Sequence, residues 1–316
     1  MTHTERIQRL LKPKKKCEFK AIDLFAGCGG LSLGFEANGI STLGYEMNND
    51  AGNTYSSNLN GECNILKLNT ALKYPKADVL LGGPPCQPFS VLGHQKGSDD
   101  LRNGFPICID AIRKIKPKLF VFENVKGLMF KNKWYLTDLE KELKALNYNV
   151  AIQILNAKNF DVPQSRERIL IIGTQKGQFN FPKKKNYIIT VKESLGESVN
   201  LMQPTSKIVT SRMQGYIDKY EAASKCITER DLHLDKPART LTCRNLSGST
   251  GDMQRIKLPN GRKRTLTIRE AAALQTFPIW YDFKGSDNSV FNQIGNAVPP
   301  MLSYHIARKV RQILES

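Results

Sequence analysis

The first 175 residues alternate short apolar runs with helix-like segments, and this alternation restricts the fold more than any other feature of the chain. Alternation at this spacing is typical of a mostly parallel β-sheet whose two faces are covered by helices. We therefore predict an α/β fold. The expected strands are Phe19–Phe25, Ile40–Glu46, Asp78–Leu81, Leu119–Phe122, Val150–Leu155 and Ile169–Ile172, and the expected helices are Leu31–Asn38, Pro106–Ile115 and Trp134–Leu146.

The chain changes character after Gly173. From about Gln175 to Arg264 it is polar and basic, with scattered Pro, Gly, Ser and Asn. A structureless loop of this length is uncommon in a compact domain, so we expect a small loop-rich domain with short strands. A helix returns at Thr267–Thr276, and Gln293–Pro300 is interpreted as a turn that opens a last helix. The expected parts are a basic extension over 1–17, a first domain over 18–175, a second over 176–262 and a C-terminal segment over 263–316.

The charge of the chain indicates its partner. Lys and Arg number 47 against 29 Asp and Glu, a net charge of +18, which makes a polyanion the expected partner. Nucleic acid is favoured over an anionic membrane because no amphipathic anchor helix accompanies the basic clusters. One such cluster, Lys12–Lys16, is a backbone-binding arm or a solubilising tail, and we favour the tail.

Cysteine usage and hydropathy indicate the compartment. No apolar stretch is long enough to span a bilayer, and residues 1–20 lack the apolar centre of a secretion signal. Seven cysteines without regular spacing argue against a disulfide framework and for a reducing cytoplasm. With four histidines and no Cys-x-x-Cys pair, no metal site is expected.

A stiff loop follows one predicted strand. Residues Gly82–Ser90 read Gly-Gly-Pro-Pro-Cys-Gln-Pro-Phe-Ser, and their prolines and glycines exclude a regular element. Cys86 is held within this loop at the end of the strand. A rigidly held thiol indicates sulfur chemistry, and the alternative is a tight turn with an incidental buried cysteine.

A second glycine-rich turn indicates a nucleoside site. Gly27, Gly29 and Gly30 lie between the first strand and the first helix, where the backbone can approach a ligand closely. Glu46 ends the next strand, about 20 positions on, where an acid can accept hydrogen bonds from both ribose hydroxyls. The third glycine of the dinucleotide fingerprint and any Gly-Lys-Ser/Thr are missing. A nucleoside without a pyrophosphate, such as S-adenosylmethionine, therefore fits better than NAD or ATP.

The candidate reactive residues all occupy strand ends. Cys86 and Glu123 each follow a predicted strand, and Arg166 and Arg168 precede another. Ligands of an open parallel sheet lie beyond the carboxyl ends of its strands. A thiol, an acid and two arginines at one sheet edge predict a catalytic site.

At this point the chain resembles a known family, the DNA cytosine-5 methyltransferases of the bacterial restriction-modification type. The resemblance covers almost the whole chain in the usual motif order and thins between about 175 and 262, where that family has its variable target-recognition domain. The matching stretches are Asp23–Gly34, Gly82–Ser90, Glu123-Asn-Val125, Gln164-Ser-Arg-Glu-Arg168, Arg269 to Pro278 and Gln293–Pro300.

The resemblance implies a fold and a reaction. The fold would be the Rossmann-like sheet of S-adenosylmethionine-dependent methyltransferases, with the C-terminal segment returning to the catalytic domain. The reaction would move a methyl group from S-adenosylmethionine to carbon 5 of a cytosine flipped out of duplex DNA, leaving S-adenosylhomocysteine. By resemblance, Cys86 adds to carbon 6 and Glu123 protonates ring nitrogen 3. Arg166 and Arg168 would hydrogen-bond the base oxygen or orient these groups, Arg168 more directly.

The resemblance also implies a cofactor site. Glu46 would bind the ribose and Met47 would cover the adenine. The family's acid that reads the adenine amino group has no clean counterpart, and Asn64 or Asn69 is left open for that role. The full expected set is Phe25, Ala26, Gly27, Gly29, Gly30, Leu31, Glu46, Met47, Asn64, Gly83, Pro85, Asn296, Ala297 and Val298.

Residues 176–262 would read the DNA sequence. The stretch Lys236–Thr242 resembles the recurrent part of the recognition domain. A loop over Val91–Asn103 could close over the flipped base, with Ser90 near the vacated space, or it is an ordinary surface loop. The expected DNA-binding residues are Ser90, Arg239, Thr240, Leu241, Arg244 and Asn245.

Two alternative functions remain open at this point. One is the same chemistry on tRNA, as in one eukaryotic branch of the family, and the other is a catalytically inactive DNA-binding homologue. We expect a monomer in the bacterial cytoplasm with no membrane partner, and leave open a cognate restriction endonuclease that acts separately. The recognition sequence cannot be derived from the chain.

Overall fold

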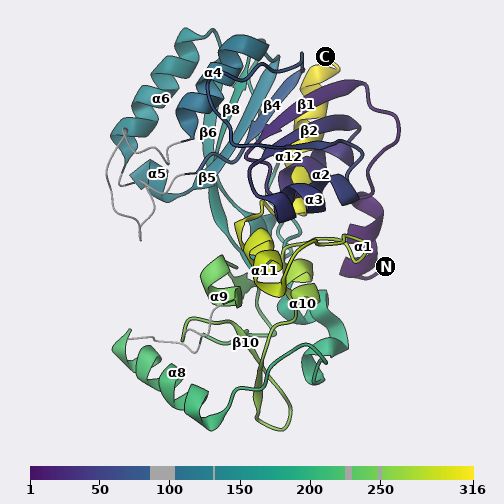
Figure 1. Cartoon of the computed structure of the whole chain (residues 1–316), viewed down its shortest axis with the longest axis vertical. Coiled ribbons are helices and arrows are strands. Elements are labelled where there is room, and N and C mark those ends of the chain that lie inside the picture. The colour runs from purple at the N-terminus through teal and green to yellow at the C-terminus, as the bar shows by residue number, and fades with distance from the viewer. Residues whose placement is uncertain (86–103, 131, 225–229, 248–250) are drawn as a thin grey trace.

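A seven-stranded sheet forms the middle layer of the upper part of the molecule in Figure 1. The computed structural model describes residues 1–85, 104–130, 132–224, 230–247 and 251–316. The strand order is β3-β2-β1-β4-β5-β8-β6. The strands are β1 (Phe19–Leu24), β2 (Ile40–Glu46), β3 (Cys63–Ile65), β4 (Val79–Gly82), β5 (Leu119–Val125), β6 (Asn149–Asn156) and β8 (Glu167–Thr174).

Strand direction determines which residues share an edge of this sheet. The pairs β1–β2, β2–β3, β1–β4 and β4–β5 are parallel, whereas β8 is antiparallel to both β5 and β6. Because β8 runs in the opposite direction, its first residues lie at the edge where β4 and β5 end. Residues before β8 therefore meet residues after the parallel strands.

The predicted mostly parallel α/β sheet is confirmed, and each of the six expected strands is present. The sequence pattern missed β3. This strand has three residues, of which Asn64 and Ile65 are exposed, so it contributes no apolar run.

Helices cover both faces of the sheet (Figure 1). Leu80 and Phe120 pack on one side with Ile109 and Leu139, whereas the neighbours Val79 and Leu81 pack on the other side. This alternation is the two-residue period of a strand that is buried on both faces. The helices are α2 (Gly30–Glu36), α3 (Asn49–Asn58), α4 (Phe105–Ile115), α5 (Gly127–Phe130), α6 (Lys133–Ala145) and α12 (Pro300–Leu314).

Residues 176–262 belong to the lower part of the molecule in Figure 1 and form short elements. Strand β7 (Gln164–Ser165) pairs with β9 and joins this part to the sheet. The hairpin of β10 and β11 extends across the expected boundary at 262. The elements are α7 (Val191–Leu195), the 3₁₀ helix η4 (Gly196–Asn200), α8 (Ser211–Ala223), β9 (Ala238–Arg239), α9 (Cys243–Ser247), β10 (Arg255–Lys257) and β11 (Lys263–Thr265).

The N-terminal extension is folded onto the molecule. Helix α1 (His3–Leu10) buries Ile7, and Leu11 after it is also buried. The N–H of Lys14 donates to the carbonyl of Glu36 at 3.0 Å. The backbone at Lys14 is therefore tied to the first domain, whereas the side chains of Lys12 and Lys14–Lys16 are exposed, and the solubilising tail stays a prediction for Lys12–Lys16.

The C-terminal segment contains three helices, of which α12 packs against α2 of the first domain. Helix α10 (Ile268–Leu274) matches the predicted helix, but α11 (Asp287–Asn296) includes residues that were assigned to a turn. Polar residues at both ends of α11 hide its helical period. Helix α12 then packs along α2 so closely that a Cβ on Gly34 would lie 2.4 Å from the Ser303 hydroxyl oxygen.

Candidate active site

An acid and a guanidinium meet at the edge of the sheet where the parallel strands end. Arg168 Nε lies 2.8 Å from Glu123 Oε1, and the two side chains are 13% and 11% exposed. Glu123 faces Leu170 in the β5–β8 register, and Arg168 stands two residues before Leu170. Both side chains therefore leave the same face of the sheet as diagonal neighbours. A carboxyl group held in this way can exchange a proton with a base bound beside it.

Arg166 has a different environment from Arg168. It is 2% exposed, and its Nη1 donates to the carbonyl of Leu241 at 2.8 Å. Nη1 and Nη2 both lie 3.2 Å from the carbonyl oxygen of Gly295. Burial, and then the charge of Arg168, lower the pKa of Arg166 to about 9. The described bonds of this guanidinium are to the chain's own backbone, so its geometry is that of a positioning residue.

The loop after β4 is tied to the Glu-Asn-Val segment. Asn124 is buried and donates from Nδ2 to the carbonyl of Pro84 at 3.0 Å. The N–H of Gly83 donates to the carbonyl of Leu24 at 3.3 Å. The segment that leads into the predicted nucleophile is therefore anchored next to Glu123. Cys86, Ser90 and the loop Val91–Asn103 lie outside the described residues.

The glycine turn and Glu46 form one hydrogen-bonded unit. Glu46 Oε2 accepts from the N–H of Gly27 at 2.9 Å, and Oε1 accepts from the N–H of Asn48 at 2.8 Å. Among the described residues, a Cβ on Gly27 or on Gly83 would meet no atom within 4 Å. The described residues therefore leave space at both backbones, and at Gly27 this space lies next to the Glu46 carboxylate, which fits the nucleoside expected from the sequence.

The other two glycines of the turn face the protein instead. A Cβ on Gly29 would lie 2.8 Å from Leu59, and one on Gly30 would lie 2.4 Å from the carbonyl oxygen of Val298. Gly29 also has a φ of +85°, which favours glycine. These glycines let the turn pack against its neighbours rather than against a ligand.

Sequence reasoning missed Asp23, which lies near the end of β1 in the stretch Asp23–Gly34. It is 1% exposed, and Ser32 Oγ donates to its Oδ2 at 2.7 Å. Burial raises the pKa of Asp23 to about 7, and the charge of Glu46 adds to this increase. Its Oδ1 has no hydrogen-bond partner among the described residues. Such an unpaired buried acceptor beside the glycine turn is available to a donor on a ligand.

The remaining cofactor candidates surround this turn. Phe25 lies beside Pro85, because a Cβ on Gly104 would lie 2.9 Å and 2.7 Å from their ring atoms. Met47 is exposed directly after β2. The N–H of Ala26 donates to the carbonyl of Tyr45 at 3.1 Å, and Leu31 is buried in α2.

The structure separates the two asparagines considered for the adenine. Asn64 is exposed on β3, opposite Tyr45 in the register and one residue before the position opposite Glu46. Asn69 Oδ1 accepts from the N–H of Ala71 at 2.8 Å and so closes a local turn. Only Asn64 is aligned with the carboxylate end of β2.

The C-terminal segment borders the same turn. Val298 is buried against Gly30, Ala297 is half-buried and Asn296 is exposed at the end of α11. Cys243 Sγ lies 3.1 Å from Asn296 Oδ1. Residues of the predicted cofactor site and of the second domain are therefore in direct contact.

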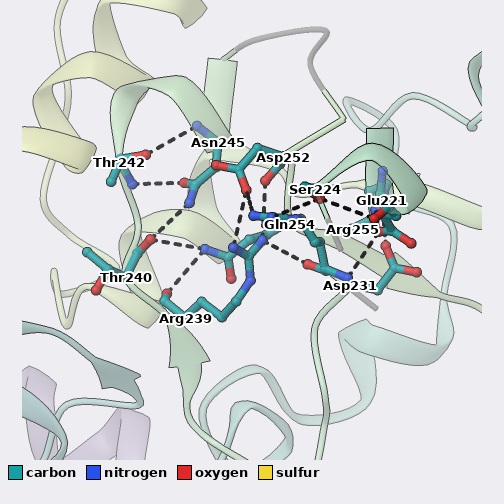
Figure 2. A network of polar contacts seen from close by, with 11 residues as sticks. Glu221, Ser224, Asp231, Arg239, Thr240, Thr242, Asn245, Asp252, Gln254 and Arg255 are labelled. Atoms are coloured by element: carbon teal, nitrogen blue, oxygen red, sulfur yellow. Dashed lines mark hydrogen bonds and ion pairs between the residues drawn. The ribbon is translucent and has the colours of Figure 1, made fainter. Parts of the chain in front are cut away.

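Two of the predicted DNA-binding residues are buried. Asn245 accepts at Oδ1 from the N–H of Thr242 at 2.8 Å and donates from Nδ2 to the carbonyl of Thr240 at 2.9 Å (Figure 2). Leu241 is fully buried. Their side chains stabilise the segment around Thr240 and are not presented to solvent, which the polar and apolar residue types alone do not reveal.

Three other DNA-binding candidates, Arg239, Thr240 and Arg244, are at least partly accessible. Arg244 is exposed on α9, and Thr240 is half-buried and donates from Oγ1 to the carbonyl of Ser165 at 2.7 Å. The guanidinium of Arg239 lies 3.3 Å from Asp252 Oδ1, and Arg230 lies 2.5 Å from the same oxygen. Figure 2 shows Arg239 and Asp252 in a network that continues through Gln254.

Sequence reasoning missed the residues that join these parts. Gln164, Gln275 and Asn124 each bond backbone groups of a distant segment. All three lie inside the motifs that carry the family resemblance, and an amide side chain within such a motif was the available signal.

The described residues contain no helix that is long and apolar enough to cross a membrane. No group of three or more His, Cys, Asp or Glu in those ranges is arranged to hold a metal ion. The five cysteines that the structure describes are free.

Solved structures with the same fold include one from E. coli and one from S. pombe. The first is titled a putative DNA modification methyltransferase encoded within a prophage, with a TM-score of 0.69 and 20% identity over 95% of this chain and 100% of that one. The second is titled Dnmt2 methyltransferase, with a TM-score of 0.72 and 17% identity over 94% of this chain and 99% of that one.

Curated relatives and a family model match most of the sequence. Type II methyltransferase M.AplI of Arthrospira platensis is 50% identical over 93% of this chain and 86% of the relative. M.PspPI of Psychrobacter sp. is 32% identical over 94% and 80%. The family model for C-5 cytosine-specific DNA methylases matches residues 19–312. Since that match covers almost the whole chain, the protein belongs to the family of C-5 cytosine-specific DNA methylases.

Proposed function

We propose that this protein methylates carbon 5 of one cytosine within a specific duplex DNA sequence, with S-adenosylmethionine as methyl donor. The observation that carries the proposal is the Glu123–Arg168 pair beside the anchored loop that leads into Cys86. Cytosine methylation requires a proton donor and a thiol, and we propose Glu123 as the donor and Cys86 as the thiol. The family model and the Type II relatives support the same reaction and do not favour the tRNA or inactive alternatives.

The residues divide the chemistry between them. The Cys86 thiolate adds to carbon 6 of the cytosine while Glu123 gives a proton to nitrogen 3, so the ring becomes an enamine that is nucleophilic at carbon 5. When bound, S-adenosylmethionine supplies an electrophilic methyl group through its sulfonium. Loss of the carbon 5 proton, to water in our proposal, then expels the Cys86 thiolate, and the proton on nitrogen 3 returns to Glu123.

The two arginines have separate roles. Arg168 orients Glu123 through the 2.8 Å contact and is available to the oxygen of the base. Arg166 holds the backbone of Leu241 and Gly295, so it acts on the site through the segments that it joins.

The cofactor would lie against the open glycine edge. Glu46 would accept from the ribose hydroxyls while it keeps its bonds from the N–H groups of Gly27 and Asn48. Asn64 takes the adenine-contacting role, because it shares the sheet edge with Glu46. Asp23 would add a hydrogen-bond acceptor at the amino-acid end of the cofactor. Gly27 and Gly83 leave the space for the ligand.

The second domain would read the DNA. Arg239, Thr240 and Arg244 are its accessible candidates, and the net charge of +18 supports phosphate contacts along a duplex. The target base must leave the helix to reach Glu123. We further propose a monomer in the bacterial cytoplasm that acts beside a separate cognate restriction endonuclease.

A covalent trap tests the nucleophile. Duplex DNA in which 5-fluorocytosine replaces cytosine should form an adduct with the protein that survives denaturation, because fluorine at carbon 5 cannot leave as a proton. Cys86→Ala should form no adduct and transfer no methyl group, yet still bind DNA. Methyl transfer by Cys86→Ala would refute the assignment.

Substrate preference separates the DNA and RNA alternatives. Transfer of a labelled methyl group should be seen with unmethylated plasmid DNA and not with tRNA. Sequencing the modified cytosines in that plasmid would give the recognition site. Preferential labelling of tRNA would overturn the DNA assignment while leaving the chemistry intact.

A further inference from the structure

Two buried glutamines connect the second domain to the end of α11. Gln164 Oε1 accepts from the N–H of Leu241 at 2.9 Å, and Gln164 Nε2 donates to Gln275 Oε1 at 2.6 Å. Gln275 Nε2 donates in turn to the carbonyls of Ile294 at 2.7 Å and Ala297 at 3.1 Å. Both glutamines are fully buried, so these bonds are not exchanged with water.

Arg166 forms a second connection between the same two places. Its guanidinium bonds the carbonyl of Leu241 and the carbonyl of Gly295. The peptide groups of Leu241 are therefore held on both sides, by Gln164 at the N–H and by Arg166 at the carbonyl. Near the end of α11, the carbonyl of Gly295 accepts from Arg166, and the carbonyl of Ile294 accepts from Gln275 in addition to the N–H of Ala297.

The two ends of this connection have different proposed ligands. Leu241 follows Thr240 in the segment that we assign to DNA. Ala297 and Val298 follow α11, and the carbonyl oxygen of Val298 touches the glycine turn at Gly30. A displacement of the DNA-facing segment therefore either breaks buried hydrogen bonds, which is costly, or shifts the residues beside the cofactor.

We propose that Gln164 and Gln275 are positioning residues that couple DNA recognition to cofactor binding. An amide suits this role because it donates and accepts at once, so the order Leu241, Gln164, Gln275, Ala297 is bonded throughout. The inference rests on the proposed function. Coupling of this kind is reciprocal: DNA must raise cofactor affinity by the same factor by which cofactor raises DNA affinity.

The experiment measures that factor directly. Titration calorimetry gives the affinity for S-adenosylhomocysteine alone and with a saturating duplex that carries the mapped recognition site. A duplex of the same composition without the site is the reference. For the wild type we expect the specific duplex to raise the affinity about tenfold, within the usual range for linked sites.

The variants remove the connection without adding charge. Gln164→Met and Gln275→Met keep the approximate side-chain volume and lose the amide. Each should reduce the coupling factor to about twofold or less. The double variant should lose no more than either single one, because both act on one chain of bonds. Gln312→Met is the matched control, since Gln312 is exposed on α12, and should keep the wild-type factor.

Gln275→Glu covers the case in which the methionine variants do not fold. A buried carboxyl group has a raised pKa, so at low pH this side chain is protonated and again donates a hydrogen bond. Coupling in Gln275→Glu should therefore recover as the pH falls from about 8.5 to 6, whereas a residue with a merely structural role would show no recovery.

Two results would overturn the inference. One is a coupling factor that stays at the wild-type value in Gln164→Met and Gln275→Met while both separate affinities fall. The other is a wild type without coupling that nevertheless binds S-adenosylhomocysteine and methylates DNA. Failure of the proposed function is distinguishable, because the wild type would then bind no S-adenosylhomocysteine or methylate no DNA.

Discussion

Glu123 and Arg168 meet across the antiparallel pair β5–β8, in a sheet whose strand β8 runs against both of its neighbours, with 2.8 Å between Oε1 and Nε. The reversal of β8 produces this contact, because it brings the start of β8 to the edge where β5 ends. A parallel strand in that place would bring the end of β8 there instead, and Arg168 would lie at the opposite edge of the sheet. The site therefore depends on strand direction as much as on residue type.

Substitutions of Glu123 and Arg168 should slow methyl transfer more than they weaken DNA binding. Glu123→Gln cannot give a proton to the base, so we expect kcat to fall at least about 100-fold. Arg168→Lys keeps a charge but loses the planar contact, and should lose about tenfold. Single-turnover methylation and DNA affinity measure the two effects. A kcat within threefold of the wild type in Glu123→Gln would exclude the proton-transfer role.

Arg166→Leu should destabilise the fold. The change leaves the carbonyls of Leu241 and Gly295 without their buried donor, at a cost of about 2–4 kcal/mol in the free energy of unfolding. Urea denaturation measures this cost. Arg113→Leu is the control, because Arg113 forms a surface ion pair with Glu142 and should change stability by less than about 1 kcal/mol. Equal stability of the two variants would contradict the positioning role of Arg166.

Substitutions at Gly30 and Gly83 should affect different properties, fold stability at Gly30 and cofactor binding at Gly83. Gly30→Ala places a Cβ 2.4 Å from a carbonyl oxygen of the protein and should destabilise the fold by about 1–3 kcal/mol. Gly83→Ala meets nothing within 4 Å and should leave the melting temperature nearly unchanged.

Gly83→Ala should instead enter the space assigned to the cofactor and weaken S-adenosylhomocysteine binding about tenfold, which corresponds to 1.4 kcal/mol. Thermal melting and titration calorimetry on both variants check the pair. Unchanged cofactor affinity in Gly83→Ala would remove that residue from the site.

Asp23 should make stability depend on pH in the absence of ligand. Its pKa is raised to about 7 by burial, so between about pH 4 and 7 the folded state holds a proton that the unfolded chain has released. Stability is therefore lost as the pH rises through this window.

Asp23→Asn does not titrate and should gain stability relative to the wild type over the same window, by up to about 4 kcal/mol above pH 7. Urea denaturation at pH 5 and pH 8 gives the comparison. A constant difference between variant and wild type at the two pH values would contradict the burial of an ionisable Asp23.

Asp252 should contribute to sequence discrimination. It holds the guanidinium groups of Arg230 and Arg239 on one carboxylate, so Asp252→Asn should loosen both. We expect the affinity ratio between specific and nonspecific duplex to fall about tenfold, while nonspecific affinity stays equal or rises. Asp138→Asn on α6 makes the same change of charge at an exposed position and is the control. An unchanged ratio in Asp252→Asn would assign this network to stability alone.

The extent of prediction from sequence differs between parts of the chain. The strands around Val79 and Leu119 were predictable because an apolar run between turn residues is a local signal. Helix α8 was not, because Ile217 is its one buried residue and a polar helix has no periodic stripe. The docking of α1 was also missed, since the residues that it contacts, such as Asp161 paired with Arg6, lie far along the chain.

In the candidate site, too, the sequence predicted the placement of some residues and misplaced others. Glu123 and Arg168 were placed together from their positions at strand ends. Leu241 and Asn245 were placed on the DNA because their motif and residue types are suited to it, yet the fold buries both. Exposure depends on what packs over a residue, and residue type does not encode that.

By itself the sequence determined the α/β class and the family and supplied the candidate reactive groups, because apolar runs, glycines, prolines and short motifs act over a few neighbouring residues. Only the tertiary structure decided which polar side chains stay available and which bind the chain's own backbone. Gln164 meets Gln275 across 111 positions and Arg166 meets Gly295 across 129. A buried peptide group needs a hydrogen-bond partner, which the fold can supply from any part of the chain. In these cases the partner is distant in the sequence, so no local sequence pattern indicates it.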